Sequence, residues 1–379
     1  MPRIRVLIVD DAVVVRRMLT DVLSADPEIE VVGAAANGRI ALAKLPQLSP
    51  DIVTLDIEMP ELNGLDTIVE LRKDYPRLPV IMFSTRTVRG ATTTLEALSL
   101  GATDYCTKPD NVGSLELAQQ RVRDELIPKI KALAGPRGRP ATKRDTARVA
   151  TAVAPVARAV RGLGLAPARP RTSPPPTPEV VAIGVSTGGP NALATLLPRL
   201  PADFPVPVLV VQHMPPLFTR FLADRLDGRC RVRVSEARAG MVLERGRVYI
   251  APGDWHMMVE RRGADVVITT HQGPPENSCR PAVDVLFRSC AAAYGEATLA
   301  IVLTGMGQDG LRGCQALSET GAPILVQDEP SSVVWGMPGT VAEAGLADQV
   351  LPLDQIAAAI VQRTSTAGPV PRSRAAAGA

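Results

Sequence analysis

The stretch IRVLIVDD, residues 4–11, is a short apolar-rich run that ends in two adjacent aspartates. Four similar runs follow, separated by helical patterns: VVGAA from Val31, IVTL from Ile52, PVIMFS from Pro79 and TDYC from Thr103. Alternation of short strands with helices is typical of parallel α/β sheets. Five such units in about 130 residues make a domain of ordinary size. We therefore predict a doubly wound (βα)5 parallel sheet over residues 1–128.

A second series of strand-like runs begins with VVAIG at Val180. The runs after it are PVLVVQ from Pro207, RVYIA from Arg247, DVVITT from Asp265, TLAIVLTG from Thr298 and PILVQ from Pro323. They predict a second doubly wound, mostly parallel α/β domain over residues 179–363. No internal repeat relates the two halves.

The composition changes abruptly between these regions. Residues 135–178 contain nine prolines, nine alanines and nine Arg/Lys residues against one acid. Such sequence cannot bury enough apolar surface to offset its ordering entropy. We predict a linker over residues 129–178 with a helical start, and polyproline II structure in TSPPPTP at 172–178. Residues 364–379 are a low-complexity tail that we expect to be disordered.

The overall charge of the chain suggests at first a nucleic-acid partner. Its 379 residues include 42 basic and 39 acidic ones, a formal net charge of +3, and the pI is 8.7. However, residues 135–178 alone carry +8 and the tail carries +2, which leaves −7 for the two folded regions. The basic charge therefore belongs to the tether, where a charge run keeps the chain solvated and extended.

Several classes of protein are excluded by simple patterns. The N-terminus reaches Asp10 and Asp11 too early for a signal peptide, and no apolar run approaches the roughly 18 residues of a membrane span. No CxxC pair occurs, so we expect neither a disulfide scaffold nor a zinc site. The five cysteines are Cys106, Cys230, Cys279, Cys290 and Cys314. We expect a soluble, cytoplasmic protein without membrane insertion.

Polar side chains follow four of the predicted strands in the first domain. Asp10 and Asp11 follow the first strand, Asp56 the third, Ser84 ends the fourth and Lys108 follows the fifth. In open α/β sheets these strand ends share one edge. Clustered carboxylates suit Mg²⁺, while a lysine and a hydroxyl suit an incoming phosphoryl group that a carboxylate attacks. Helix capping by aspartate is the alternative, but it explains only one or two of the five.

These residues resemble the response-regulator receiver domain over residues 1–128, through VDD at 9–11, LDIEMPELNG at 55–64, Ser84 and KP at 108–109. The resemblance implies that Asp56 accepts a phosphoryl group from a histidine kinase. It also implies that Asp10, Asp11, Asp56 and the backbone carbonyl of Glu58 hold Mg²⁺. Ser84 and Lys108 would sense the phosphoryl group, and Tyr105 would be the switch aromatic. Asn63 stands at a turn where the family often has aspartate.

A glycine-rich loop, GVSTGGP at 184–190, follows the first strand of the second domain. Its Gly184-x-Ser186-x-Gly188 spacing fits a nucleophile elbow, a serine on a sharp turn from strand to helix. The same spacing also fits an anion-binding loop. By itself the pattern favours neither interpretation.

Only three histidines occur, and a serine nucleophile needs one as its base. His213 ends the strand that follows the serine's strand, so both side chains can share one sheet edge. A core or helix-capping histidine is the alternative there. His256 and His271 resemble loop or strand-face residues, and their spacing suits no metal site.

The third member of such a triad should be a carboxylate at another strand end. Asp309, in TGMGQDG after the strand TLAIVL, is the best placed. Asp254, Asp284 and Asp328 remain rivals. The chain order serine, histidine, aspartate differs from that of α/β-hydrolases, so the fold is a different one.

These motifs resemble the catalytic domain of the chemotaxis methylesterase (CheB) family over residues 179–362. They are GVSTGGP at 184–190, QHMPP at 212–216, YIAPGD at 249–254, RPAVDVLF at 280–287, LTGMGQDG at 303–310 and GMPG at 336–339. The resemblance implies Ser186 as nucleophile, His213 as base and Asp309 as its orienting group. It also implies an oxyanion donor in the Met306 amide, with Thr187 lining the site.

A receiver, a linker and this domain, in that order, are the architecture of the family. The resemblance implies hydrolysis of glutamate methyl esters on methyl-accepting chemoreceptors, and deamidation of receptor glutamines. It also implies a CheA-type chemotaxis histidine kinase as partner, Mg²⁺ for receiver phosphorylation, no cofactor for the esterase reaction and a monomeric chain. We hypothesise that the unphosphorylated receiver covers the esterase cleft. Ala282 replaces a frequent serine, and the linker is longer than usual.

Two other functions compete with this one. A receiver that drives DNA binding fits the basic pI, but the second half shows no helix-turn-helix pattern and no basic recognition helix. A catalytically inactive receptor-binding scaffold would not need Ser186, His213 and Asp309. A different ester substrate is harder to exclude, because the sequence holds no record of the ester.

Overall fold

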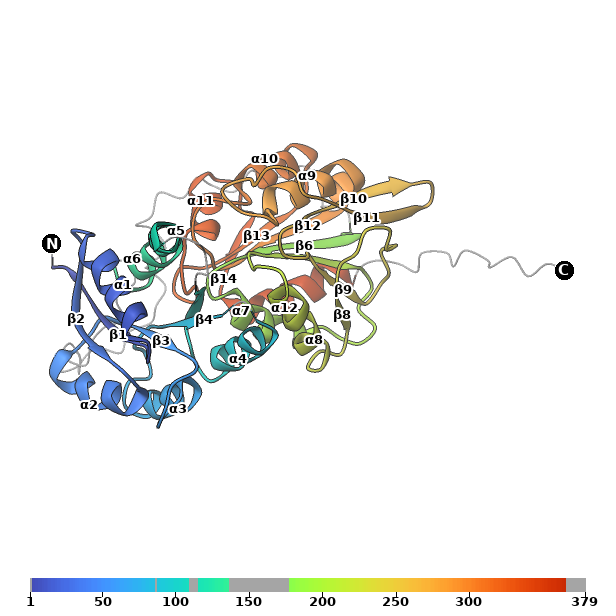
Figure 1. Cartoon of the computed structure of the whole chain (residues 1–379). Helices are drawn as coiled ribbons and strands as arrows, with labels where there is room; N and C mark the ends of the chain where they lie inside the picture. Colours follow the sequence, from blue (N-terminus) through green and yellow to red (C-terminus); the bar gives the residue numbers. More distant parts are fainter. Residues whose placement is uncertain (1, 86, 109–114, 136–176, 366–379) are drawn as a thin grey trace, which may run out of the picture.

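A computed structural model describes residues 2–85, 87–108, 115–135 and 177–365 of the chain. Residues 172–176 of the polyproline II prediction and most of the predicted linker lie outside these ranges. All but the first two residues of the predicted tail, and Pro109, also lie outside them. The described residues form two α/β units, one from each half of the chain (Figure 1).

The first unit is built on a five-stranded parallel sheet with strand order β2-β1-β3-β4-β5. Its strands are β1 (Ile4–Val9), β2 (Ile29–Ala35), β3 (Ile52–Asp56), β4 (Val80–Ser84) and β5 (Asp104–Thr107). The strand order reverses beside β1, which pairs with both β2 and β3. The loops after β1 and β3 therefore open into one crevice at the carboxyl edge of the sheet.

Helices cover both faces of this sheet. One face carries α1 (Val13–Ser24), α5 (Leu115–Arg121), the π-helical turn η1 (Val122–Leu126) and α6 (Ile127–Ala134). The other carries α2 (Gly38–Leu48), α3 (Gly64–Asp74) and α4 (Val88–Ser99). Ile130 and Leu133 of α6 are buried in the core beneath α1, so packing of the first unit extends beyond residue 128.

The second unit contains a seven-stranded sheet with strand order β14-β13-β12-β6-β7-β9-β8, in which every neighbouring pair is parallel. The strands are β6 (Val180–Val185), β7 (Val208–Gln212), β8 (Arg233–Glu236), β9 (Arg247–Ile250), β12 (Thr298–Val302), β13 (Ile324–Gln327) and β14 (Gln349–Leu351). The strands β12, β6 and β7 lie side by side at the centre and are fully buried. Their carboxyl ends therefore bring three loops together.

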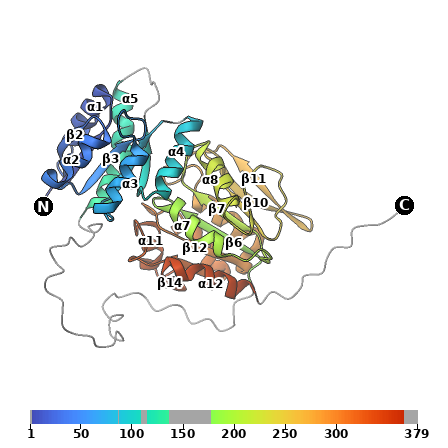
Figure 2. The same cartoon turned by 90° about the horizontal axis from the view of Figure 1, so that it is seen from below.

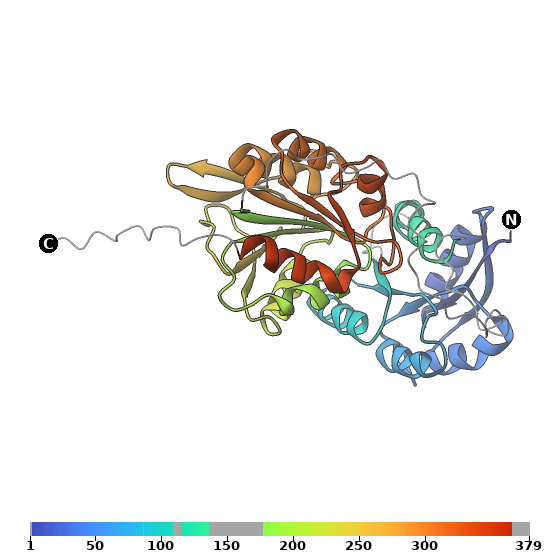
Figure 3. The ribbon, with the colours of Figure 1, turned by 180° about the vertical axis from the view of Figure 1, so that it is seen from behind.

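Helices also cover both faces of the second sheet. One face carries α9 (Val283–Tyr294), α10 (Leu311–Thr320) and α11 (Met337–Glu343), and the other carries α7 (Gly189–Leu196), α8 (Phe218–Asp227) and α12 (Leu353–Thr364). Figure 3 shows α12, in red, lying across its face of the sheet. Short 3-10 turns, η3 (Leu197–Arg199) and η4 (Gly295–Ala297), complete the unit.

One predicted strand has a different place in the fold. Residues 265–270 do form part of a strand, β11 (Asp265–His271), but it pairs with β10 (His256–Arg262) in an antiparallel hairpin outside the large sheet. An isolated bridge also joins its Val267 to Val242. The strands β8, β10 and β14 were not predicted, because they are short or rich in charged residues and lack a continuous apolar run.

The two units pack against each other through α4 and β5 of the first and α7 and α8 of the second (Figure 2). The Tyr105 ring stacks on Phe218 with ring centroids 5.0 Å apart. The guanidinium of Arg225 donates to the carbonyl of Leu95, and Asn191 Nδ2 donates to the carbonyl of Ala102 over 3.5 Å. Asn191 and Phe218 lie at the beginnings of α7 and α8, the helices that follow Ser186 and His213, whereas Arg225 lies in the last turn of α8.

Within the described ranges, no helix combines the length and the apolar character that crossing a membrane requires.

Candidate functional sites

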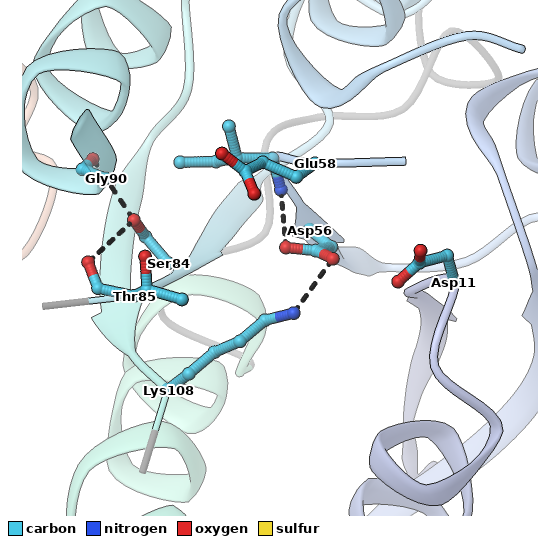
Figure 4. A pocket seen from close by; sticks show the side chains of 8 residues that line it. Asp11, Asp56, Glu58, Ser84, Thr85, Gly90 and Lys108 are labelled. Atoms are coloured by element: carbon cyan, nitrogen blue, oxygen red, sulfur yellow. Dashed lines mark hydrogen bonds and ion pairs between the residues drawn. The ribbon is translucent and has the colours of Figure 1, made fainter. Parts of the chain in front are cut away.

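The first candidate site lies at the crevice of the five-stranded sheet. Lys108 Nζ lies 2.9 Å from Asp10 Oδ2 and 2.8 Å from Asp56 Oδ2, and so bridges the ends of β1 and β3. The backbone amide of Ile57 donates to Asp56 Oδ1 over 2.7 Å. Figure 4 shows Asp11 on one side of Asp56, with Lys108 and Ser84 on the other. The structure thus brings all five predicted strand-end residues to one edge.

Negative charge at this site exceeds what the lysine balances. Burial raises the pKa of Asp56 to about 6, with Lys108 lowering it and Asp10 raising it. Carboxylate oxygens of Asp10, Asp11 and Asp56 lie within 4.8 Å of one another. All three are hard oxygen donors, the type that Mg²⁺ selects. The residues present therefore fit a divalent cation.

A cavity of about 230 Å³ opens beside Asp56, and its lining includes Glu58, Ser84 and Lys108. The Ser84 hydroxyl donates to the carbonyl of Gly90 over 3.2 Å. The exposed Glu58 side chain pairs with Arg89 at 3.3 Å.

Two further predicted positions lie outside this cavity. The Tyr105 ring faces the second unit, where it stacks on Phe218, and Lys129 Nζ lies 5.1 Å from its centroid. Asn63 caps α3 by accepting from the amide of Asp66 over 2.9 Å. Asparagine is as good a helix cap as aspartate. The turn is therefore preserved although this chain has Asn63 where the family often has aspartate.

The second candidate site is assembled from the three central loops of the seven-stranded sheet. Ser186 follows β6, and its amide donates to the carbonyl of Thr304, after β12, over 3.0 Å. His213 follows β7, and its amide donates to the carbonyl of Val185 over 3.2 Å. An added Cβ at Gly305 would lie 2.8 Å from the Cβ of Ser186, so only glycine allows this close approach.

His213 and Asp309 form a buried pair. Nε2 of His213 lies 2.8 Å from Asp309 Oδ2, and only 2% of Asp309 is exposed. The backbone amide of Val283 also donates to Oδ2, while Oδ1 accepts from the amides of Asp284 and Gly310. Burial opposes ionisation of Asp309, but the bond from His213 and these amides outweigh it and hold its pKa below the usual value.

The ionised carboxylate determines the tautomer of the histidine. A carboxylate only accepts hydrogen bonds, so Nε2 of His213 carries the proton and Nδ1 of the neutral ring is the basic nitrogen. Burial opposes protonation of His213, but hydrogen bonding to Asp309 and the contact with Cys279 raise its pKa above the usual value. The pair is therefore arranged for proton uptake at Nδ1.

The rival carboxylates are engaged elsewhere. Asp254 accepts from Arg280 Nε over 2.9 Å. Asp284 accepts from the amide of Gly313 over 2.7 Å, at the beginning of α10. Asp328 accepts from the Ser331 hydroxyl. Among these four aspartates, only Asp309 contacts His213.

Ser186 and His213 are neighbours that do not hydrogen-bond in this conformation. Among the described contacts, the Ser186 hydroxyl makes no hydrogen bond to the imidazole, and Nδ1 instead lies 3.5 Å from Cys279 Sγ. Proton transfer thus needs a rotation of the serine side chain or a small shift of the ring.

Two backbone amides near the serine are available to a ligand. Within the described part of the chain, the amides of Thr187 and Met306 donate to no protein acceptor. The loop that contains Met306 is held in place because Gly305 accepts from the amides of Gly336 and Met337, at 3.0 and 2.9 Å. These contacts explain the GMPG motif structurally.

Sequence reasoning missed three residues of the second site. Gln212 is buried, and its Nε2 donates to the carbonyls of Ser186 and His213 over 3.0 and 3.3 Å. Asn277 Nδ2 donates to Asp309 Oδ1 over 2.9 Å. Cys279 contacts the histidine. Gln212 lay inside the QHMPP motif, but Asn277 and Cys279 lie in a loop with no pattern of their own.

Comparison with known proteins places the chain in a family. The family model for the CheB methylesterase matches residues 181–360, and the model for the response regulator receiver domain matches residues 6–119. A protein-glutamate methylesterase/protein-glutamine glutaminase of Trichodesmium erythraeum is 52% identical, over 96% of this chain and 99% of that protein. The chain belongs to the CheB methylesterase family.

Another relative in this family, the protein-glutamate methylesterase/protein-glutamine glutaminase of Nocardioides sp., is 51% identical over 97% of this chain and 98% of that protein. The crystal structure of the Thermotoga maritima CheB methylesterase catalytic domain is 42% identical, covers 49% of this chain and 98% of that chain, and has a TM-score of 0.48. The matched CheB range contains Ser186, His213 and Asp309, and the receiver range contains Asp56 and Lys108.

Proposed function

We propose that this protein is a phosphorylation-controlled hydrolase that removes methyl esters from glutamates of methyl-accepting chemoreceptors and deamidates receptor glutamines. The family and the activity named for its relatives support this proposal. The observation that carries it is the buried His213–Asp309 pair beside Ser186, because it gives a serine an oriented base.

In the proposed reaction, the Ser186 oxygen attacks the ester or amide carbonyl as Nδ1 of His213 takes its proton. The amides of Thr187 and Met306 stabilise the oxyanion. His213 then protonates the leaving methoxide or amine, so methanol or ammonia departs and an acyl-serine remains. A water molecule, deprotonated by His213, attacks the acyl-serine. His213 then returns the proton to the Ser186 oxygen, and glutamate is released. Asp309 stabilises the imidazolium throughout.

The experiment that tests this mechanism is methanol release from methylated receptor membranes. We expect Ser186→Ala to abolish release while Asp56 is still phosphorylated by a small phosphodonor. The matched control is Ser318→Ala, on the outer helix α10 and away from the strand-end loops, which should keep the wild-type rate. Retained release in Ser186→Ala would contradict the nucleophile assignment.

We propose Asp56 as the phospho-acceptor, with a CheA-type chemotaxis histidine kinase as donor and the cytoplasm as the place of reaction. A carboxylate oxygen of Asp56 would attack phosphorus and displace the kinase's histidine nitrogen. Mg²⁺ held by Asp10, Asp11, Asp56 and the Glu58 carbonyl would neutralise phosphoryl oxygens when bound. Lys108 would exchange its contact with Asp56 for the phosphoryl group, and Ser84 would donate to it.

Regulation follows, in this proposal, from the contact between the two units. The first unit holds the beginning of α7 through Asn191 and packs against α8 through Phe218. Phosphorylation that loosened these contacts would free the loops of Ser186 and His213 and open the site to a receptor helix. We propose that the isolated chain is a monomer.

Two variants test this regulation in the same methanol assay. Arg225→Ala removes the bond from Arg225 to Leu95 and should raise the unphosphorylated rate. Asp56→Asn should keep the basal rate but lose stimulation by the phosphodonor. Unchanged basal activity in Arg225→Ala would count against control through this contact.

A further inference from the structure

A thiol and an imidazole meet beside the catalytic pair. Cys279 Sγ lies 3.5 Å from Nδ1 of His213, and Nε2 of the same ring lies 2.8 Å from Asp309 Oδ2. Cys279 is half-buried and lies in the segment between β11 and α9. Donor atoms of Cys279, His213 and Asp309 all lie within 4.8 Å of one another.

This geometry matches one edge of a zinc coordination tetrahedron. Zn–S bonds are about 2.3 Å and Zn–N bonds about 2.0–2.1 Å, so tetrahedral ligands place sulfur and nitrogen about 3.5 Å apart. The observed separation between Sγ and Nδ1 is 3.5 Å. The separation of the two donor atoms is therefore the one that a shared zinc ion requires.

The other ring nitrogen already has the partner that zinc-bound histidines usually have. Such histidines donate their second N–H to a carboxylate, which fixes the tautomer and raises the basicity of the ligating nitrogen. Here Nε2 of His213 pairs with Asp309, and the carboxylate is held by further amides. The basic nitrogen, Nδ1, consequently faces the thiol.

Other candidate donors are less suitable. Cys106, Cys290 and Cys314 are buried. Burial raises the pKa of Cys230 to about 11, so its thiolate is scarce. The ring nitrogens of His256 are occupied by Pro274 and Ala282. The acidic site of the first unit offers only oxygen ligands, which suit harder ions than zinc.

We propose that Cys279 and Nδ1 of His213 form a binding site for Zn²⁺ or a similar borderline-soft divalent ion, with Asp309 supporting the histidine. Binding forms Zn–S and Zn–N bonds, releases the thiol proton to solvent and changes no oxidation state. Water completes the coordination. The ion occupies the nitrogen that takes the Ser186 proton, so it inhibits the esterase. Binding itself does not depend on the proposed function; inhibition does.

Binding is tested directly with Co²⁺ as a spectroscopic probe, on the untagged full-length protein. We expect thiolate-to-cobalt charge-transfer absorption in the wild type that Zn²⁺ displaces at one equivalent. Cys279→Ser should lose this absorption, and so should His213→Ala. Cys230→Ser is the matched control and should keep it. Ser186→Ala should also bind, which separates this proposal from the nucleophile assignment. Unchanged absorption in Cys279→Ser would overturn the site.

Inhibition is tested in the methanol assay, with each variant compared with its own metal-free rate. Zn²⁺ should inhibit the wild type, and a chelator should restore the rate. In Cys279→Ser the half-inhibitory Zn²⁺ concentration should rise at least tenfold. Equal sensitivity of the two proteins would overturn the inhibitory role even if cobalt binds. Matching thermal melting curves would verify that the variant is folded.

Discussion

The substitution Asp309→Asn tests the central pair of the second site most sharply. Asp309 accepts five hydrogen bonds: Oδ2 from His213 and Val283, and Oδ1 from Asn277, Asp284 and Gly310. An asparagine keeps one acceptor oxygen and has an NH₂ group in place of the other. Whichever way the amide is turned, this NH₂ group faces hydrogen-bond donors that now have no acceptor. The orientation that keeps three bonds points NH₂ at His213 and at the amide of Val283.

The magnitude follows from the two lost bonds. Hydrogen bonds to charged groups contribute about 1.5–3 kcal/mol each, so their loss costs about 3–6 kcal/mol of stability. For a domain of this size, the expected fall in Tm is about 10 °C. That figure applies to a ring that keeps its proton on Nε2. Catalysis suffers if the ring instead recovers a bond by accepting from the new NH₂ group, because His213 must then move its proton from Nε2 to Nδ1. The basic nitrogen is then lost, and a wrong tautomer costs about 10⁴ in kcat.

The assays are methanol release and thermal melting at neutral pH, with Asp254→Asn as the matched control. Asp254 also loses a charge in that variant, but its partner is Arg280 and it does not contact His213. We expect the control to stay within a fewfold of the wild-type kcat. An Asp309→Asn protein with kcat near the wild type, or an equal loss in the control, would refute the reasoning.

Three other perturbations have definite expected outcomes. Gly305→Ala should inactivate the esterase while leaving Asp56 phosphorylation intact, because its Cβ would lie 2.8 Å from the Cβ of Ser186; rates and phosphorylation are measured together. The folded-state pKa of Asp56 is raised to about 6 from 3.8, so its ionised form destabilises the metal-free fold above pH 6, by about 3 kcal/mol. Asp56→Asn should therefore raise the Tm at pH 7.5 in chelator, a gain that disappears near pH 4; equal melting at pH 7.5 would contradict it. Burial lowers the pKa of His256 in the folded chain. The neutral His256 therefore contributes its full stability above about pH 6.5, and this stability falls at lower pH because the unfolded chain binds a proton at His256 more readily. The Tm difference between wild type and His256→Asn should narrow from pH 7.5 to 5, and a constant difference would count against this.

Much of the fold could be predicted because its strands are buried on both faces. Strands such as β1, β3, β6 and β12 are mostly apolar runs, and polar residues stand at or soon after their carboxyl ends, so both the strands and these ends are visible in the sequence. The short strand β14 and the charged strand β10 lack that pattern, and their pairing depends on neighbours far away in the chain.

The residues of the candidate sites also fall into those that the sequence pattern predicts and those that it does not. Residues at strand ends, such as Asp56, Ser186 and His213, could be proposed because a parallel sheet brings its carboxyl ends together. The choice of Asp309 over three rival aspartates could not be made from spacing, because each of them follows a strand or lies in a polar loop. The family resemblance implied Asp309, and the hydrogen bonds around each carboxylate distinguish it from the other three.

By itself, the sequence determined two parallel α/β domains, a proline-rich and basic segment between them, and the strand-end residues of both sites. These features follow from local composition and from the spacing of apolar residues along the chain. The tertiary structure showed that Asp309, which the family resemblance implied, is the carboxylate bonded to His213, and it alone decided that α4 packs on α7 and α8 and that Cys279 lies beside Nδ1. The physical reason is the range of the interactions. The spacing of apolar residues and the residue types of a loop influence structure over only a few residues. The contact of Cys279 with His213 joins positions 66 residues apart and exists only once both loops are folded.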